Sequence, residues 1–385
     1  MSGREDRIRI IKEIEQSRKS QLIVYFTGDR KPFGSRIAED AVRPLYEHLL
    51  NLQLSKEIKS IDLYLYSRGG DVSVPWRIAT MIREFGKDFN ILIPYKAQSA
   101  ATLLSLGSDS IVMTKKAELG PIDPTLVRTT AEGGGTAPAQ EIAVEDVNSF
   151  LSFIKDRANI NDQIALAQVV KTLAEQVSPL TLGTINRQNS HIRLAARKML
   201  ASQKEKVDEE RISTVIETLT EKMYSHGHSI GRAEARDIGL KVQYPDSSTE
   251  EMIWSLYLLY EEHLKLNEPI DPEIELGNDE EKVMDDLEIA IIESAQKLHI
   301  FKTNVKLKKD RQIPPSPNIN INMNLQLPPN VQPQQLPSQV QQVIQQLMGQ
   351  LQQQIGQLVM QEIIKQSPLK GIHCRVVGGR WVQVV

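Results

Sequence analysis

The chain has 385 residues, which is enough for one large domain with additions or for two modest domains. Its net charge of −3 provides no basic field, so nucleic acid is not expected as a partner. The single cysteine, Cys374, excludes an intramolecular disulfide and any metal site built on a cysteine cluster. The charged start lacks the apolar core of a secretory signal, and no apolar run reaches the roughly 18 residues of a membrane span. We therefore expect a cytoplasmic protein that does not span a membrane.

Helical and strand patterns alternate through the first 130 residues. Short apolar runs predict buried strands at 22–26, 61–67, 89–94 and 110–114. Apolar residues at spacings of three and four predict helices at 7–18, 37–54 and 74–86, and another begins after Ser99. Such alternation is typical of βαβ units, so we expect an α/β fold with a mainly parallel sheet.

The middle of the chain is predominantly helical in pattern. A Gly-rich loop at 129–140 precedes helical periodicity over 143–224. A short helix capped by Gly239 and a strand are expected within 228–245. Two amphipathic blocks follow, at 249–266 and at about 279–299. We therefore predict a main domain over 1–248 and a helical extension over 249–301.

The C-terminal part differs in composition. A linker rich in Pro, Asn and Gln covers 302–336, and the strict alternation at 318–327 is typical of a strand or of a disordered Asn-rich segment. The last predicted unit, 337–385, contains a helix at 337–365 and a hairpin that turns at Gly378-Gly379. The apolar positions of the helix fall at threes and fours, namely Val340, Ile344, Leu347, Leu351, Ile355 and Leu358. This seam suits either self-association or docking onto the main domain.

Two motifs of the first 130 residues could carry chemistry. Gly69-Gly70 follows a predicted strand directly, and paired glycines let backbone N–H groups approach a ligand closely, as in an oxyanion hole. Ser99 stands at the start of a predicted helix, where the N–H of Ala100 could join the same oxyanion hole. Taken alone, each motif has a structural explanation, because most Gly-Gly pairs are turns and a serine at a helix start commonly caps it.

The order of these motifs resembles that of the serine dehydrogenase proteinase family. The shared features are SRGGD after a strand, P-x-x-A-x-S-A-A-T after another, ELGPIDP at 118–124, and the later blocks 178–200 and 225–242. The resemblance covers about residues 5–245. It implies an α/β Clp/crotonase-type β-β-α superhelix with helical additions and a partly disordered C-terminal extension, related to signal peptide peptidase A (SppA) and the Clp protease. The chain departs from the family pattern where Arg68 replaces the Pro of S-P-G-G and where Ala101 replaces the Gly of A-M-S-A-G.

The resemblance also implies a serine-type endopeptidase with Ser99 as the nucleophile and with Gly69, Gly70 and Ala100 as oxyanion donors. No histidine occupies the Clp-type position, so a Ser-Lys dyad is expected, and Lys155 resembles the lysine of the related peptidases. A solvated helix lysine is the alternative for Lys155. Lys198, His226 and His228 are second choices for the base; the histidine pair lacks a third metal ligand, so neither a metal nor a cofactor is expected.

The predicted function is that of a serine protease, a hydrolase that cleaves a peptide or protein substrate through an acyl-enzyme on Ser99. Folds of this group commonly form rings or stacked trimers, so a homo-oligomer is expected. Two alternatives stay open. One is a non-catalytic scaffold or binding protein that keeps the fold, and the other is an acyl-thioester enzyme of the crotonase type.

Overall fold

A computed structural model describes residues 2–55, 59–122, 125–128, 140–143, 149–150, 152–222, 227–312 and 336–384. The chain forms two compact units. The first comprises Met1–Ile270, Glu288–Lys302 and Arg380–Val385, and the second Asp271–Leu287 and Thr303–Gly379. No helix among the described residues is both long enough and apolar enough to cross a membrane.

The first unit is built on a mainly parallel sheet. Its parallel strands are β1 (Gln21–Thr27), β2 (Ser60–Tyr66), β3 (Asp88–Ile93), β5 (Ser110–Met113) and β10 (Val242–Gln243). They lie in the order β10-β5-β3-β2-β1, and parts of β11 (Glu281–Glu293), β12 (Leu298–Arg311) and β13 (Leu369–Val384) follow. β1 pairs with β11 in antiparallel fashion, with Tyr25 opposite Ile292.

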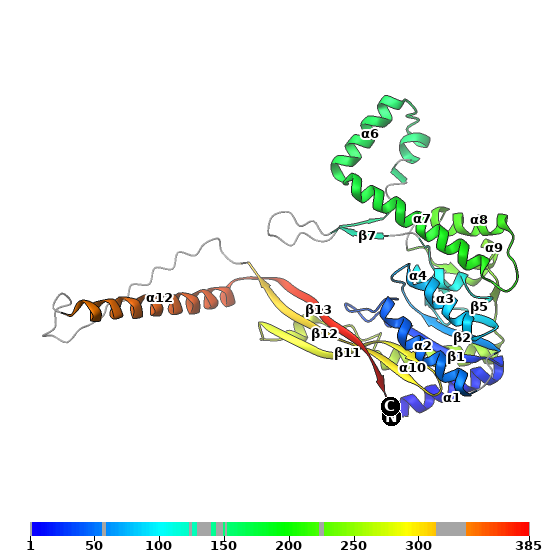
Figure 1. The fold of residues 1–385 in the computed structure, drawn as a ribbon, viewed down its shortest axis with the longest axis horizontal. Helices are drawn as coiled ribbons and strands as arrows, with labels where there is room; N and C mark the ends of the chain where they lie inside the picture. Colours follow the sequence, from blue (N-terminus) through cyan, green and yellow to red (C-terminus); the bar gives the residue numbers. More distant parts are fainter. Residues whose placement is uncertain are drawn as a thin grey trace. The chain divides into compact units, whose positions relative to one another are not determined.

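Helices cover both faces of this sheet, so its central strands are buried almost throughout (Figure 1). On one face, α2 (Val42–Ser55), α3 (Val74–Phe85), α4 (Ala100–Leu106), α7 (Pro179–Ala201) and α8 (Glu209–Glu217) share one apolar cluster with the strands. On the other face, α1 (Ser2–Arg18) and α10 (Ser247–His263) pack with a second cluster. This arrangement confirms the predicted α/β class.

Shorter elements complete the first unit. The helical ones are η1 (Glu39–Ala41), η2 (Phe153–Arg157), α6 (Gln163–Gln176), η3 (Thr218–Lys222) and α9 (Arg232–Ile238), which ends at Gly239 as expected. A small three-stranded sheet has the order β4 (Lys96–Ala97), β6 (Glu118–Leu119), β9 (Ile230–Gly231). β7 (Thr125–Arg128) pairs with β8 (Gln140–Ala143).

The second unit combines the remaining parts of β11, β12 and β13 with α11 (Pro272–Leu276) and α12 (Ser338–Gln366). Arg311 of β12 forms an ion pair with Glu280 and donates to the backbone oxygen of Ser367 at 2.7 Å. The predicted helix at 337–365 is confirmed as α12.

Three expectations for the C-terminal part are wrong. The block at 279–299 is not helical but forms β11 and the start of β12, because Ala290–Glu293 pair with β1 inside the sheet, where Ile289–Glu293 are all buried. The first ten residues of the predicted linker also belong to β12, where Val305 and Leu307 are buried between exposed or partly exposed lysines. β13 runs straight through Gly378-Gly379, so there is no hairpin there. The segment predicted as a strand at 318–327 lies outside the described residues, and the domain boundaries stay predictions.

Candidate active site

The candidate site lies where three parallel strands end. β1, β2 and β3 run in the same direction, so their carboxyl ends meet at one edge of the sheet, where ligands bind in open α/β sheets. The residues that leave these ends are Gly28-Asp29 after β1, the turn Ser67–Asp71 after β2, and the stretch Tyr95–Ser99 after β3. An isolated bridge between Ser67 and Ala97 ties the last two together.

The turn Ser67–Asp71 is held by backbone bonds to Ile37. The N–H of Ile37 donates to Gly69 O, and the N–H of Asp71 donates to Ile37 O, both at 2.8 Å. Because this parallel bridge uses the groups on either side of Gly70, the N–H of Gly70 faces away from Ile37. That N–H has no hydrogen-bond partner among the described residues.

A buried hydroxyl that the sequence analysis missed organises the same turn. Ser67 Oγ accepts the N–H of Gly69 at 3.0 Å and a hydrogen bond from Thr27 Oγ1 at 2.8 Å. The N–H of Gly69 is therefore used within the turn, which leaves Gly70 as the free donor of the glycine pair. The position of Ser67, at the end of a strand and two residues before a glycine, was the available signal for such a turn.

Gly69 contributes a close approach to Ser99. Its φ of +104° lies in the region that favours glycine. A Cβ at this position would lie only 2.8 Å from Ser99 Cβ and 3.3 Å from the nitrogen of Ala100. The structure thus brings together the predicted residues Gly69, Gly70, Ser99 and Ala100.

Ser99 has a strained backbone. Its φ is 51° and its ψ is −115°, a combination outside the regions that residues with a side chain normally adopt. Such a conformation costs about 1–3 kcal/mol and is concentrated at functional sites. Its side chain makes no capping hydrogen bond to α4, so the capping interpretation does not apply. The residue is partly exposed, and no described side chain is bonded to its Oγ.

Small buried residues behind Ser99 let α4 approach its neighbours. Ala97, Ala100 and Ala101 are all fully buried. Thr102, another residue that the sequence analysis missed, accepts the N–H of Gly120 at 3.0 Å with its Oγ1, which also lies 2.7 Å from Ala97 O. This hydroxyl therefore fastens the start of α4 to the chain after β6.

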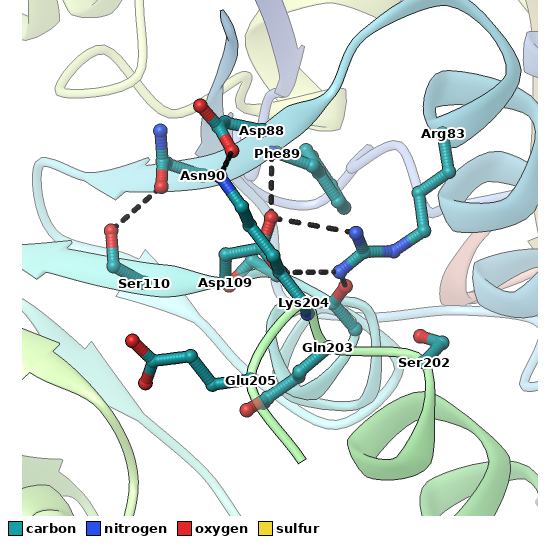
Figure 2. Close-up of polar contacts among 12 residues, drawn as sticks. Arg83, Asp88, Phe89, Asn90, Asp109, Ser110, Ser202, Gln203, Lys204 and Glu205 are labelled. Carbon is teal, nitrogen blue, oxygen red and sulfur yellow. Dashed lines mark hydrogen bonds and ion pairs between the residues drawn. The ribbon is translucent and has the colours of Figure 1, made fainter.

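The opposite end of α4 is fixed by a polar network around Asp109 (Figure 2). Arg83 of α3 donates to Gly107 O at 2.7 Å and to Asp109 Oδ1 at 2.9 Å. Asp109 also accepts the backbone N–H groups of Phe89 in β3 and of Lys204 after α7. Despite partial burial, the hydrogen bonds from Arg83 and from these amides keep the pKa of Asp109 below its usual value.

Charged residues surround the strand ends. The half-buried Asp29 lies 3.0 Å from Lys96 Nζ and 4.0 Å from Arg68 Nε, and it accepts the hydroxyl of Tyr66 at 2.8 Å. Burial and the Asp29 charge raise the pKa of Tyr66, so this hydroxyl stays a neutral donor. Arg68, one of the departures from the family pattern, has a side chain that is 54% exposed next to Gly69.

The structure does not bring a base to Ser99 within the described residues. Lys155 lies in η2 and is exposed. Lys198 of α7 is also exposed, with its Nζ 5.7 Å from the centre of the Trp76 ring. His228 Nε2 lies 2.9 Å from a carboxylate oxygen of Glu234, and His226 is outside the described residues. No group of His, Cys, Asp and Glu side chains in the described part of the chain could hold a metal ion.

Comparison with known proteins gives a family for the part that contains these motifs. Residues 2–133 match the ClpP-like SDH-type serine proteinases. Two uncharacterized proteins of Methanocaldococcus jannaschii, MJ0137 and MJ1495, are 26% and 22% identical to the chain. The matches cover 67% and 66% of this chain and 80% and 76% of those proteins.

Solved structures of two kinds of protease are also similar. A mutant of the membrane-bound stomatin-specific protease 1510-N is 15% identical over 56% of this chain and 78% of its own, with a TM-score of 0.34. ClpP1 from Listeria monocytogenes is 13% identical over 62% of this chain and 97% of its own, also with a TM-score of 0.34. The resemblance predicted from the motifs is thus confirmed by the family match, because the segment that carries Gly69, Gly70 and Ser99 is similar to the ClpP-like SDH-type serine proteinases.

Proposed function

We propose that the protein is a serine endopeptidase that cleaves peptide bonds through an acyl-enzyme on Ser99. The observation that carries this proposal is the strained backbone of Ser99. This residue lies so close to Gly69, at the ends of the parallel strands, that a side chain on Gly69 would clash with it. The N–H groups of Gly70 and Ala100 are the oxyanion donors in this proposal. Neither is bonded to another described group.

The reaction follows from these positions. Ser99 Oγ attacks the carbonyl carbon of the scissile peptide, and the carbonyl oxygen becomes an oxyanion that accepts both N–H groups. The serine proton passes to a base, which returns it to the departing amine as the C–N bond breaks. Water then attacks the serine ester in the same way, which releases the acid and restores the hydroxyl of Ser99.

The base in this proposal is Lys155, on the strength of its resemblance to the lysine of the related peptidases. A general base must lie within hydrogen-bond reach of the proton that it takes, so this proposal requires Lys155 Nζ to approach Ser99 Oγ when substrate is bound. The substrate would bind in an extended form, adding a strand beside the Gly69-Gly70 turn, where backbone bonds recognise peptides of varied sequence.

A serine-reactive fluorophosphonate probe and a fluorogenic peptide library test the nucleophile. We expect the wild type to be labelled and to cleave peptides, and Ser99→Ala to lose both activities. Ser73→Ala is a matched control, because Ser73 flanks the same turn and its side chain makes no capping bond. Labelling that survives in Ser99→Ala would exclude Ser99. A wild type that is neither labelled nor active would favour the non-catalytic binding protein.

A second set of variants tests the base. Lys155→Ala should reduce the acylation rate by at least 100-fold, the usual contribution of a positioned base, and its residual activity should rise with pH. Lys198→Ala and His228→Ala should leave the rate near that of the wild type. A wild-type rate in Lys155→Ala would exclude the dyad while leaving the assignment of Ser99 intact.

A further inference from the structure

Helix α12, orange in Figure 1, has an apolar face that no described residue of its own unit buries. None of its 29 residues is buried, and all of them are described. Val340, Leu347, Leu351 and Leu358 are 41%, 53%, 47% and 64% exposed. Helices in proteins owe most of their stability to the packing of an apolar face, so α12 requires a partner for that face.

The seam of α12 repeats regularly along the helix. Its apolar positions are Val340, Ile344, Leu347, Leu351, Ile355 and Leu358, and the next position at this spacing is Glu362. Each position recurs after 11 residues, which corresponds to about 3.67 residues per turn, so the stripe stays on one face of a nearly straight helix. A continuous stripe of this length suits another straight helix better than a globular surface.

The charge of α12 indicates what kind of helix this is. Ser338–Gln361 contains no charged residue, and the only charges of the helix are Glu362 and Lys365. A helix that lies on an anionic membrane carries Lys and Arg on its polar face, and α12 lacks them there. Helices that select a different partner commonly do so with charges beside the seam, which are also absent. Nothing on α12 opposes pairing with an identical helix.

The order of the spacings along the seam predicts the relative direction of two paired α12 helices. The steps along the seam are four, three, four, four, three and four, which read the same in both directions around Leu351. In an antiparallel pair, Ile344 therefore faces Leu358 of the second copy, and Leu347 faces Ile355. A parallel pair would instead place the two Glu362 carboxylates at the same level.

The helix start supports the antiparallel orientation. Pro337 provides no side-chain cap at the N-terminus of α12, and its backbone oxygen accepts the N–H groups of Val340 and Gln341. An antiparallel copy brings its Glu362 to this end, where the helix dipole favours an acidic side chain. We propose that α12 pairs with the α12 of a second copy of this chain, antiparallel and with Leu351 at the two-fold axis.

The mass of the full chain in solution is the first test. Light scattering after size exclusion should give an assembly for the wild type, and Leu347→Lys with Leu351→Lys should reduce its mass at least twofold. Gln342→Lys with Gln353→Lys is the matched control, because these exposed residues lie on the opposite side of α12 and should leave the mass unchanged. A monomeric wild type, or a seam variant that keeps the wild-type mass, would overturn the proposal.

Disulfide trapping tests the orientation in a Cys374→Ser background. A mixture of Val340→Cys and Glu362→Cys chains should form a cross-linked dimer of the two variants, because antiparallel pairing places these positions side by side. Val340→Cys alone should remain uncross-linked. Cross-linking of Val340→Cys alone would mean a parallel pair, and no cross-link in either sample would exclude this seam. Neither result depends on the peptidase activity.

Discussion

Replacing Gly69 by alanine tests whether the protein depends on the close approach of the glycine turn to Ser99. The new Cβ would lie 2.8 Å from both Gln98 O and Ser99 Cβ, although ordinary contacts of a Cβ begin at 3.4 Å. The turn and Ser99 must therefore move apart by about 0.6 Å. A displacement near 1 Å in an active site can lower the rate about 100-fold, so we expect Gly69→Ala to slow acylation by roughly 10- to 100-fold.

The same change should also destabilise the fold. An alanine held at a φ of +104° costs about 1–2 kcal/mol, and the close contacts add strain, so we expect a loss of roughly 2–4 kcal/mol. Urea unfolding gives this free energy, and fluorophosphonate labelling under native conditions gives the rate. Measuring both on the same preparation separates a misplaced Ser99 from a simple loss of folded protein.

Gly183→Ala is the control for Gly69→Ala. Gly183 lies within helix α7, and no atom lies within 4 Å of the position that its Cβ would take. Alanine there should stabilise the protein by up to about 1 kcal/mol and leave labelling unchanged. If Gly69→Ala behaved like Gly183→Ala in both assays, the close fit between the turn and Ser99 would be refuted.

Two further variants test the surroundings of the site and of the sheet. Thr102→Val keeps the shape of the side chain but leaves the N–H of Gly120 without its acceptor, so we expect a loss of about 1–3 kcal/mol in urea unfolding and slower labelling; an unchanged free energy would contradict the role of this hydroxyl. Burial lowers the pKa of His48 to about 3, so the folded state favours the neutral ring. The stability that the neutral His48 contributes is fully present above the unfolded pKa near 6.5 and is lost as the pH falls toward 3. Between pH 7 and 5, we expect the free energy of unfolding to fall by about 2 kcal/mol for this reason. The free energy of unfolding of His48→Gln should depend less on pH between 7 and 5. An equal fall for the wild type and the variant would exclude His48 as the cause.

Much of the core could be predicted because its signals are local. Short apolar runs such as LIVYF at 22–26 can be buried only in a sheet that is covered on both faces, and the helical spacing around them supplies that cover. The candidate site follows from the same logic, since Gly69-Gly70 and Ser99 follow neighbouring parallel strands. Such strands end at one edge, so residues 29 or 30 positions apart become neighbours.

The remaining features depend on contacts that a single segment does not reveal. The block at 279–299 has enough apolar residues for a helix, and its pairing with β1 and β12 in the sheet makes it a strand instead. The hydrogen bonds of Ser67 to Gly69 and of Thr102 to Gly120 need the folded turn to bring the donor and acceptor together. The general base could be predicted least well, because the position of a lysine side chain relative to Ser99 depends on tertiary structure that no sequence motif specifies.

The conformation of Ser99 separates a catalytic role from a structural one. Small residues such as Ala97 and Ala100 are explained by the close packing of α4, which a scaffold protein needs as much as an enzyme does. A serine that only started this helix would adopt an extended backbone and cap it, which stabilises a helix by about 1 kcal/mol. Ser99 instead has a φ of 51° and makes no cap, so its conformation opposes the stability of α4. A cost of this kind at a partly exposed hydroxyl, beside two free N–H groups, is what the proposed role of Ser99 as the nucleophile predicts.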